Sequence, residues 1–104
     1  MIELTKDNFD EEVNIDGVVM VDYWSESCER CIEIMPDVIK LSEEYGEQIK
    51  FCKLNIKGSR RLAMAQKVMG LPSIVFYKNG ERLEHLSGEE LEVEDIASTI
   101  KNYL

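Results

Sequence analysis

The positions of apolar and polar residues along the chain predict strands and helices that alternate. Residues 2–4 are a short strand candidate. Thr5 has the position of a helix N-cap, and Phe9 and Val13, four residues apart, give the short helix that follows one apolar side. Residues 18–24 are nearly all apolar, which is typical of a strand that is covered on both faces of its sheet.

A long helix is predicted next, beginning at Cys28. Its apolar residues recur at helical spacing, and they are Ile32, Met35, Val38, Ile39, Leu41 and Tyr45. Pro36 predicts a kink in this helix, and Gly46 ends it. Residues 49–56 alternate between apolar and polar positions and therefore predict a third strand.

The second half of the chain predicts a helix, a hairpin and a last helix. The helix covers residues 60–68, and an apolar run at 73–77 predicts a strand. Asn79-Gly80 is a strong two-residue hairpin signal, so residues 81–86 are predicted to pair with that strand. The last helix is marked by Val93, Ile96, Ile100 and Tyr103. Five strands and four helices in this order predict an α/β fold with a mixed five-stranded sheet flanked by helices on both faces.

Length and composition bound this picture. The chain has 104 residues and is 44% hydrophobic, which suits one domain over residues 1–104 with a single core. No apolar run is long enough to cross a membrane. The acid-rich residues 1–17 do not resemble a signal peptide, so we expect a cytoplasmic protein, in which structural disulfides are rare.

The net charge makes some classes of partner unfavourable, and the distribution of charged residues sets one segment of the chain apart. A net charge of −9 disfavours nucleic acid and anionic membranes as partners. Residues 48–80 nevertheless contain no Asp or Glu. Their seven basic residues are Lys50, Lys53, Lys57, Arg60, Arg61, Lys67 and Lys78. This basic block is either a docking face or a solvated surface, and the sequence leaves both interpretations open.

Cys28 and Cys31 carry the clearest chemical signal. They follow a buried strand and stand at the start of a helix, where backbone N–H groups and the positive helix end favour a thiolate. The alternative is half of a zinc site. Zinc takes four ligands in structural sites, and only Cys52 and His85 remain to complete the set. The pair therefore indicates dithiol/disulfide chemistry, with no metal and no bound cofactor.

Several motifs then resemble the thioredoxin family in order and spacing over almost the whole chain. They are Val21-Asp22-Tyr23-Trp24, Cys28 with Cys31, Pro36, Lys53-Leu54-Asn55, Gly70-Leu71-Pro72-Ser73, Lys78-Asn79-Gly80 and Gly88. The resemblance implies that Cys28 attacks a substrate disulfide and that Cys31 resolves the mixed disulfide. It thereby implies the thioredoxin fold.

Asp22 and Lys53 are the next candidates for a catalytic role. Asp22 is a lone carboxyl group within an apolar strand, where burial raises the pKa of an acid. The resemblance implies that Asp22 accepts a proton from Cys31 and that Lys53 lies near it. The alternative is an Asp at a strand end that faces water.

The resemblance also implies a substrate-binding surface. Leu71-Pro72 matches the family's cis-proline loop, which would leave the Leu71 backbone free to pair with a substrate strand. The alternative is a trans proline that opens a strand. The remaining residues assigned to this surface are Trp24, Glu29, Arg30 and Gly88. Trp24 has an alternative interpretation as a core residue.

The residues around the cysteines depart from the family pattern. Most thioredoxins carry Trp-Cys-Gly-Pro-Cys-Lys, whereas residues 27–32 read Ser-Cys-Glu-Arg-Cys-Ile. Arg30 adds a cation that can stabilise a Cys28 thiolate, while Glu26, Glu29 and Glu33 oppose it. Residues 24–29 are similar to thioredoxins of amino-acid-fermenting anaerobes.

The functional expectation follows from the resemblance. It implies a cytoplasmic monomer that reduces protein disulfides and is re-reduced by a flavin-containing thioredoxin reductase, NADPH- or ferredoxin-linked. Two alternatives stay open. One is a more oxidising, isomerase-like variant, and the other is a binding module that uses the Leu71-Pro72 edge with non-catalytic cysteines.

Overall fold

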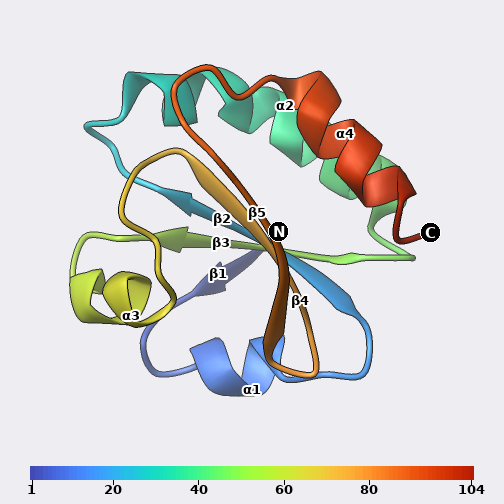
Figure 1. Ribbon diagram of the computed structural model, residues 1–104, viewed down its shortest axis with the longest axis horizontal. Coiled ribbons are helices and arrows are strands. Elements are labelled where there is room, and N and C mark those ends of the chain that lie inside the picture. The colour runs from blue at the N-terminus through green and yellow to red at the C-terminus, as the bar shows by residue number, and fades with distance from the viewer.

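A five-stranded sheet lies between two layers of helices in the computed structural model, which describes all residues from 1 to 104 (Figure 1). The elements in chain order are β1 (Ile2–Leu4), α1 (Phe9–Val13), β2 (Val18–Trp24), α2 (Glu29–Tyr45), β3 (Lys50–Asn55), α3 (Arg60–Ala65), β4 (Ser73–Lys78), β5 (Glu81–Ser87) and α4 (Val93–Lys101). The predicted number and order of elements are confirmed.

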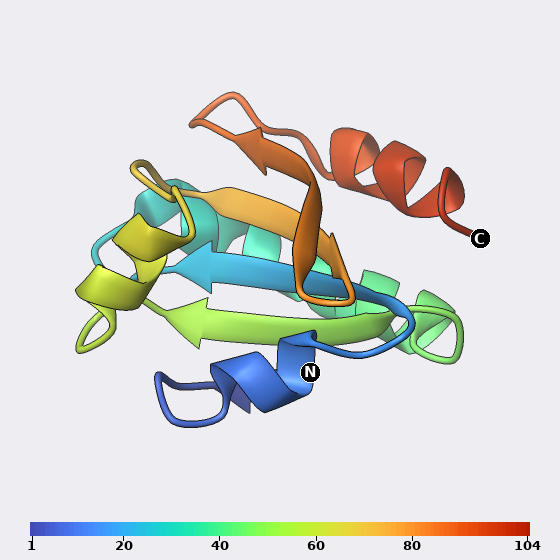
Figure 2. The same cartoon turned by 60° about the horizontal axis from the view of Figure 1, so that its bottom comes forward.

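The sheet is mixed, with the strand order β1-β3-β2-β4-β5. β1, β3 and β2 are parallel to one another, whereas β4 runs antiparallel to β2 and β5 antiparallel to β4. The arrowheads of β2 and β3 therefore point to the same edge, where α3 also lies (Figure 2). Side chains from loops that follow these strands meet at this edge.

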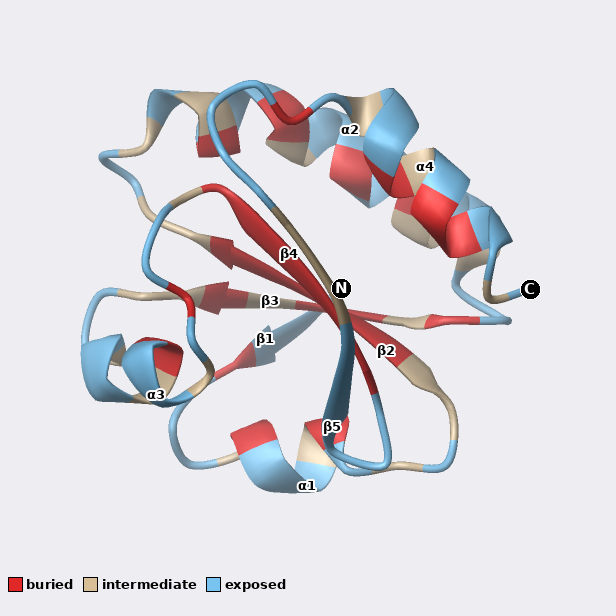
Figure 3. Cartoon of the chain, viewed as in Figure 1, coloured by how far each residue is buried: buried red, intermediate tan, exposed pale blue.

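Each face of the sheet has its own core, because successive side chains of a strand point to opposite faces. On one face, Val19, Val21 and Tyr23 of β2 pack with residues of α1 and α3. On the other face, Met20 and Phe76 pack with residues of α2 and α4. The central strands are accordingly buried on both sides, while the helices expose their outer surfaces (Figure 3).

The ends of α1 and α3 differ from the predicted ones. The Thr5 hydroxyl accepts a hydrogen bond from Asp7 N–H at 3.1 Å, but it caps an isolated turn, and Asn8 is the N-cap of α1. α3 ends at Ala65 rather than at residue 68, because Lys67 adopts a φ of 62°. Two bonds from the N–H groups of residues 67 and 68 then close a Schellman turn that normally uses glycine.

The kink predicted at Pro36 and the hairpin predicted at Asn79-Gly80 have different outcomes in the structure. α2 runs without a break through Pro36, so the predicted kink stays a prediction. The hairpin between β4 and β5 forms as predicted, with φ values of 54° at Asn79 and 79° at Gly80. These positive values belong to the two-residue turn whose twist matches that of the strands. None of the helices has the length and apolar character needed to cross a membrane.

Candidate functional site

Cys28 and Cys31 lie where β2 leads into α2. β2 ends at Trp24, and Cys28 is the N-cap residue of α2. The two cysteine side chains form a disulfide, with their Cα atoms 5.3 Å apart. Cys28 is half-buried, whereas Cys31 is wholly inaccessible to solvent. Of the two sulfurs, only that of Cys28 is therefore open to a partner molecule.

The start of α2 places backbone dipoles around the Cys28 sulfur. Its Sγ accepts a hydrogen bond from Cys31 N–H at 3.1 Å. The free N–H groups of a first helical turn carry partial positive charge, and they favour an anion placed there. This arrangement suits a thiolate at Cys28, and its stabilisation on reduction stays a prediction.

Asp22 lies in the interior of the protein, within β2. Its side chain is fully buried on the face of the sheet that α2 covers, and neither carboxyl oxygen has a hydrogen-bond partner. Burial raises the pKa of Asp22 to about 7, while the positive charge of Lys53 opposes part of that rise. The carboxyl group therefore exchanges its proton near neutral pH.

Lys53 connects Asp22 with Trp24. It pairs with Asp22 across the two parallel strands β2 and β3. Its ammonium nitrogen lies 5.8 Å from the centre of the Trp24 ring, which is within the range of a cation–π contact. Trp24 is half-buried, and its indole N–H is buried without a partner. Lys53 thus links Asp22 and Trp24 into one group.

The loop before β4 provides an open backbone edge. The Leu71-Pro72 peptide bond is cis. The Ser73 hydroxyl donates to the carbonyl of Gly70 at 2.6 Å, and Gly88 N–H donates to the carbonyl of Pro72 at 3.1 Å. Leu71 itself makes no backbone hydrogen bond within the chain, so its N–H and C=O are free to pair with an extended segment.

Glu29 and Arg30 share a depression with Cys28. It has a volume of about 490 Å³, and its lining residues are Ser27, Cys28, Glu29, Arg30, Glu33, Leu71 and Glu89. The Arg30 guanidinium donates to the carbonyl of Leu91 at 2.6 and 3.2 Å and contacts the Glu92 carboxylate at 3.3 Å. No hydrogen bond joins the Arg30 side chain to Cys28, and stabilisation of a Cys28 thiolate by the Arg30 charge stays a prediction.

Comparisons with known proteins agree on one family. The sequence profile of the Thioredoxin family matches residues 1–102. This chain belongs to the thioredoxin family. It is 43% identical to a thioredoxin of Acetoanaerobium sticklandii over the whole of both chains. It is 38% identical to a thioredoxin of Peptoclostridium acidaminophilum, with 100% of this chain and 96% of the relative covered.

A solved structure supports the thioredoxin fold. The thioredoxin Mala s 13 of Malassezia sympodialis superposes with a TM-score of 0.89 over 97% of this chain and 90% of its own. The identity in this comparison is 24%, so the likeness concerns the fold. Family membership together with the Cys28–Cys31 disulfide identifies a thiol-disulfide oxidoreductase.

His85 contributes to the thioredoxin site although the sequence gives it no role. Its Nε2 lies 3.0 Å from the Ser73 hydroxyl, and its Nδ1 lies 2.6 Å from an Arg82 guanidinium nitrogen. Because the Ser73 hydroxyl proton goes to Gly70, His85 donates from Nε2 and accepts at Nδ1. Burial and the charge of Arg82 lower the pKa of His85, which favours this neutral form. The pairing of β4 with β5 brings His85 to Ser73, and no local sequence motif predicts this contact.

Cys52 and His85 do not join the cysteine pair. Cys52 is fully buried in the core beside α1 and α3, and burial raises its pKa to about 11. No group of three or more His, Cys, Asp or Glu side chains in the chain is placed to hold a metal ion. Cys52 therefore behaves as a small apolar side chain.

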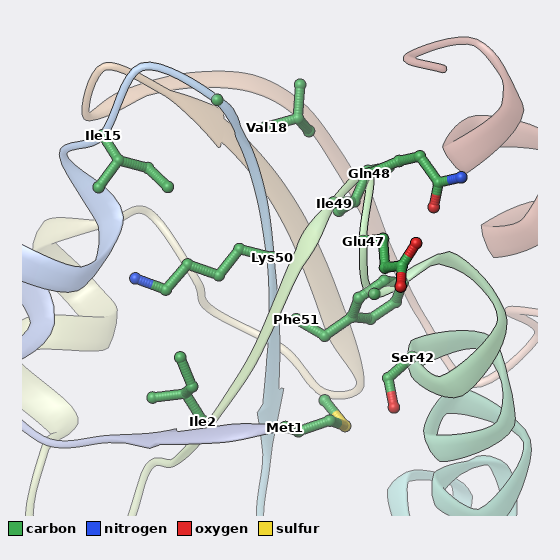
Figure 4. A pocket seen from close by; sticks show the side chains of 12 residues that line it. Met1, Ile2, Ile15, Val18, Ser42, Glu47, Gln48, Ile49, Lys50 and Phe51 are labelled. Atoms are coloured by element: carbon green, nitrogen blue, oxygen red, sulfur yellow. The ribbon is translucent and has the colours of Figure 1, made fainter.

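A separate depression of about 380 Å³ lies at the opposite end of the sheet, where β2 and β3 begin (Figure 4). Lys50 reaches across it, and its ammonium group donates to the Glu12 carboxylate at 2.7 Å and to the Glu12 carbonyl at 2.8 Å. This contact fastens α1 to the start of β3. The depression contains no cysteine, so the redox chemistry belongs to the other end.

Proposed function

We propose that this protein is a cytoplasmic protein-disulfide reductase that receives electrons from a flavin-containing thioredoxin reductase, NADPH- or ferredoxin-linked. The observation that carries the proposal is the unequal placement of the two sulfurs. Cys28 is accessible at a helix N-terminus, Cys31 is buried beneath it, and the unpaired Leu71 backbone lies in the same depression. A substrate strand bound at Leu71 brings its disulfide to Cys28.

The first step uses the reduced protein. The Cys28 thiolate attacks one sulfur of the substrate disulfide, so that an intermolecular S–S bond forms as the substrate S–S bond breaks. The second substrate sulfur leaves as a thiolate and takes a proton from solvent. Backbone N–H groups at the start of α2 stabilise the attacking charge before this step.

The second step uses Cys31 and Asp22. The Cys31 thiol gives its proton to the Asp22 carboxylate, and the resulting thiolate attacks the Cys28 sulfur. The Cys28–Cys31 disulfide forms, and the substrate leaves with its second thiol. Two electrons have then passed from the protein to the substrate, whose two released sulfurs take their protons from solvent, and the proton of Cys31 stays on Asp22 until it exchanges with solvent. A pKa of about 7 suits Asp22 to this exchange at neutral pH.

Trapping with Cys31→Ser tests the reaction. This variant cannot complete the second step, so it holds protein substrates as mixed disulfides on Cys28, and gels run without reductant show them. Cys28→Ser is the matched control and captures none. If Cys31→Ser captures nothing, or if Cys28→Ser retains full reductase activity, the proposal fails. A binding module with non-catalytic cysteines keeps its partners in both variants.

The electron donor is a separate part of the proposal. Ser27, Glu29 and Arg30 stand where most thioredoxins carry Trp, Gly and Pro, so we infer that an ordinary NADPH-thioredoxin reductase reduces this protein poorly. A dedicated flavin reductase reduces it well. Turnover with each reductase over a range of protein concentrations measures both efficiencies. Equal kcat/KM values would overturn this part and leave the disulfide chemistry standing.

A further inference from the structure

Three depressions that share lining residues lie next to one another, and one of them contains Cys28. The depression of about 490 Å³ described above holds Cys28 itself. A polar one of about 280 Å³ is lined by Ser25, Glu26, Ser27, Asn55, Lys57 and Arg60. An apolar one of about 170 Å³ contains Met64 and Met69 together with Arg60 and Leu71. Ser27, Arg60 and Leu71 each belong to two of the three, so the depressions form one continuous surface.

The surface has opposite charges on its two sides. Lys57 and Arg60, which we call the basic rim, are exposed on the side of α3. The chain's ion pairs join Arg30 to Glu33 and Glu92 and Lys50 to Glu12, so both cations of the basic rim are unpaired. The opposite side carries Glu29, Glu33 and Glu89, and one acid, Glu26, lies on the side of the basic rim, where the two cations outnumber it.

The apolar part lies between the basic rim and the Leu71 backbone. Met64 and Met69 are 60% and 81% exposed, although large apolar residues are usually covered. Methionine adapts its shape to different apolar partners. α3 and the loop after it, which carry these residues, stand beside the carboxyl ends of β2 and β3 in both views (Figure 1 and Figure 2).

We propose that this surface selects protein partners in which the reacting disulfide is flanked by acidic side chains that face the basic rim and by an apolar side chain that packs on Met64 and Met69. The proposal rests on the reductase function above and names the chemistry of its partners. The basic block of the sequence is thus a docking face at Lys57 and Arg60.

Charge complementarity at this range acts mainly on the rate of encounter. Exposed ion pairs add little to affinity, whereas a local field steers a charged partner and raises its association rate by about tenfold or more. Screening limits this field to about 10 Å at 0.1 M salt. The net charge of −9 favours basic partners at long range, so a preference for acidic ones has to come from the basic rim.

Reduction of matched peptides tests the proposal. The probes are disulfide-linked dimers of one short peptide with two Glu, two Gln or two Lys beside the cysteine, placed before it in one series and after it in another. Pre-reduced protein is mixed with each probe at low salt, and release of peptide thiol gives the second-order rate constant. In one series or both, we expect the Glu probe to react about tenfold faster than the Lys probe. Salt at 0.5 M removes the difference, and the double variant K57E/R60E reverses it.

The variant K40E/K78E is the matched control, because it makes the same change in net charge on exposed residues away from the cysteines. We expect it to keep the wild-type preference. Faster reaction of the Lys probe with wild-type protein in both series, or an equal loss of preference in K40E/K78E, would overturn the proposal. The Gln probe separates the two claims: if wild type and K40E/K78E both reduce it, the reductase function stands whatever the charge preference, and if neither does, both claims fail.

Discussion

Asp22 combines two properties that rarely occur together at one residue. It is fully buried, and no group in the protein donates a hydrogen bond to it. Taking a carboxylate out of water without a partner is costly, so the folded state holds its proton up to about pH 7. In an unfolded chain the same group loses its proton near pH 3.8. Folding and protonation of Asp22 are therefore linked.

Asp22→Asn tests this linkage through pH. Between pH 3.8 and 7 the folded protein binds the proton more tightly than the unfolded chain, so Asp22 lowers the free energy of unfolding as pH rises through this range. Asparagine carries no such dependence. In urea titrations from pH 4 to 9, we expect the stability of Asp22→Asn relative to wild type to rise by up to about 4 kcal/mol and to level off above pH 7.

The exposed Asp37 of α2 gives the control for that measurement. The Asp37 carboxyl group is exposed to solvent in the folded protein as it is in the unfolded chain. We therefore expect the difference in the free energy of unfolding between Asp37→Asn and wild type to vary little over the same pH range. A flat profile for Asp22→Asn as well would show that Asp22 is not protonated on folding.

Cys52 gives a second prediction at this scale. Its side chain is fully buried and its pKa is raised to about 11, so the native protein holds it as an unreactive thiol. With the Cys28–Cys31 disulfide intact, we expect no thiol to react with an aromatic disulfide reagent at pH 8. In 6 M guanidinium one thiol reacts. Rapid modification of the native protein would contradict this burial.

Single residues were predictable where their own chemistry stands out in the sequence. The spacing of Cys28 and Cys31, and the single acid within the apolar run at position 22, can be recognised from a few neighbouring residues. His85 does not, because its contact with Ser73 depends on the pairing of β4 with β5. The direction of Arg30 likewise depends on a carbonyl 61 residues away.

At the scale of elements, Arg30 joins the first turn of α2 to the start of α4. Its guanidinium is held by the Leu91 carbonyl and the Glu92 carboxylate, and Glu92 also caps α4. Hydrogen bonds that involve a charged group contribute about 1.5–3 kcal/mol when they are partly buried. The contact therefore positions the turn that carries Cys28.

Arg30→Ala removes this connection between the two helices. We expect the free energy of unfolding to fall by about 1–2 kcal/mol, because the Leu91 carbonyl loses its charged donor. Urea unfolding followed by circular dichroism measures the change. Arg61→Ala, on the exposed side of α3 and without an ion pair, is the control and costs less than about 0.5 kcal/mol. Equal losses in the two variants would show that the α2–α4 contact does not stabilise the fold.

The kind and order of the elements follow from hydrophobic spacing, whereas their ends do not. α3 ends three residues before the predicted end at residue 68, because Lys67 adopts a left-handed conformation that is usually found at glycine. Thr5 offers a good capping hydroxyl, yet the chain uses it for a separate turn and starts α1 after Asn8. Local competition of this kind is decided by tertiary packing.

At the scale of the whole molecule, burial is concentrated in the middle of the sheet. β2 and β4 are neighbours and each is covered on both faces, while β1 and β5 form the edges. β5 has no buried residue, and α3 has one, Ala63. Stability is therefore uneven across the fold.

Native-state hydrogen exchange measures this unevenness. We expect amides of β2 and β4 to exchange only through global unfolding, so that their rates follow the urea dependence of the whole protein. Amides of β5 and α3 exchange through local opening, with little dependence on urea. If β5 is protected as strongly as β2, exposure does not determine local stability here. The strand order behind this prediction was accessible from sequence only through the family resemblance, since spacing alone does not say which strands are neighbours.

Cys28 is the N-cap of α2 and, in the proposed reaction, also the attacking group, so its two roles can be separated by substitution. Serine and threonine are good N-cap residues, because their oxygen accepts from the same backbone N–H groups. A chain with serine at position 28 can therefore keep the helix start intact and lose only the sulfur. An alanine there loses both. A redox-silent descendant that retains the partner surface is thus one conservative substitution away from this protein.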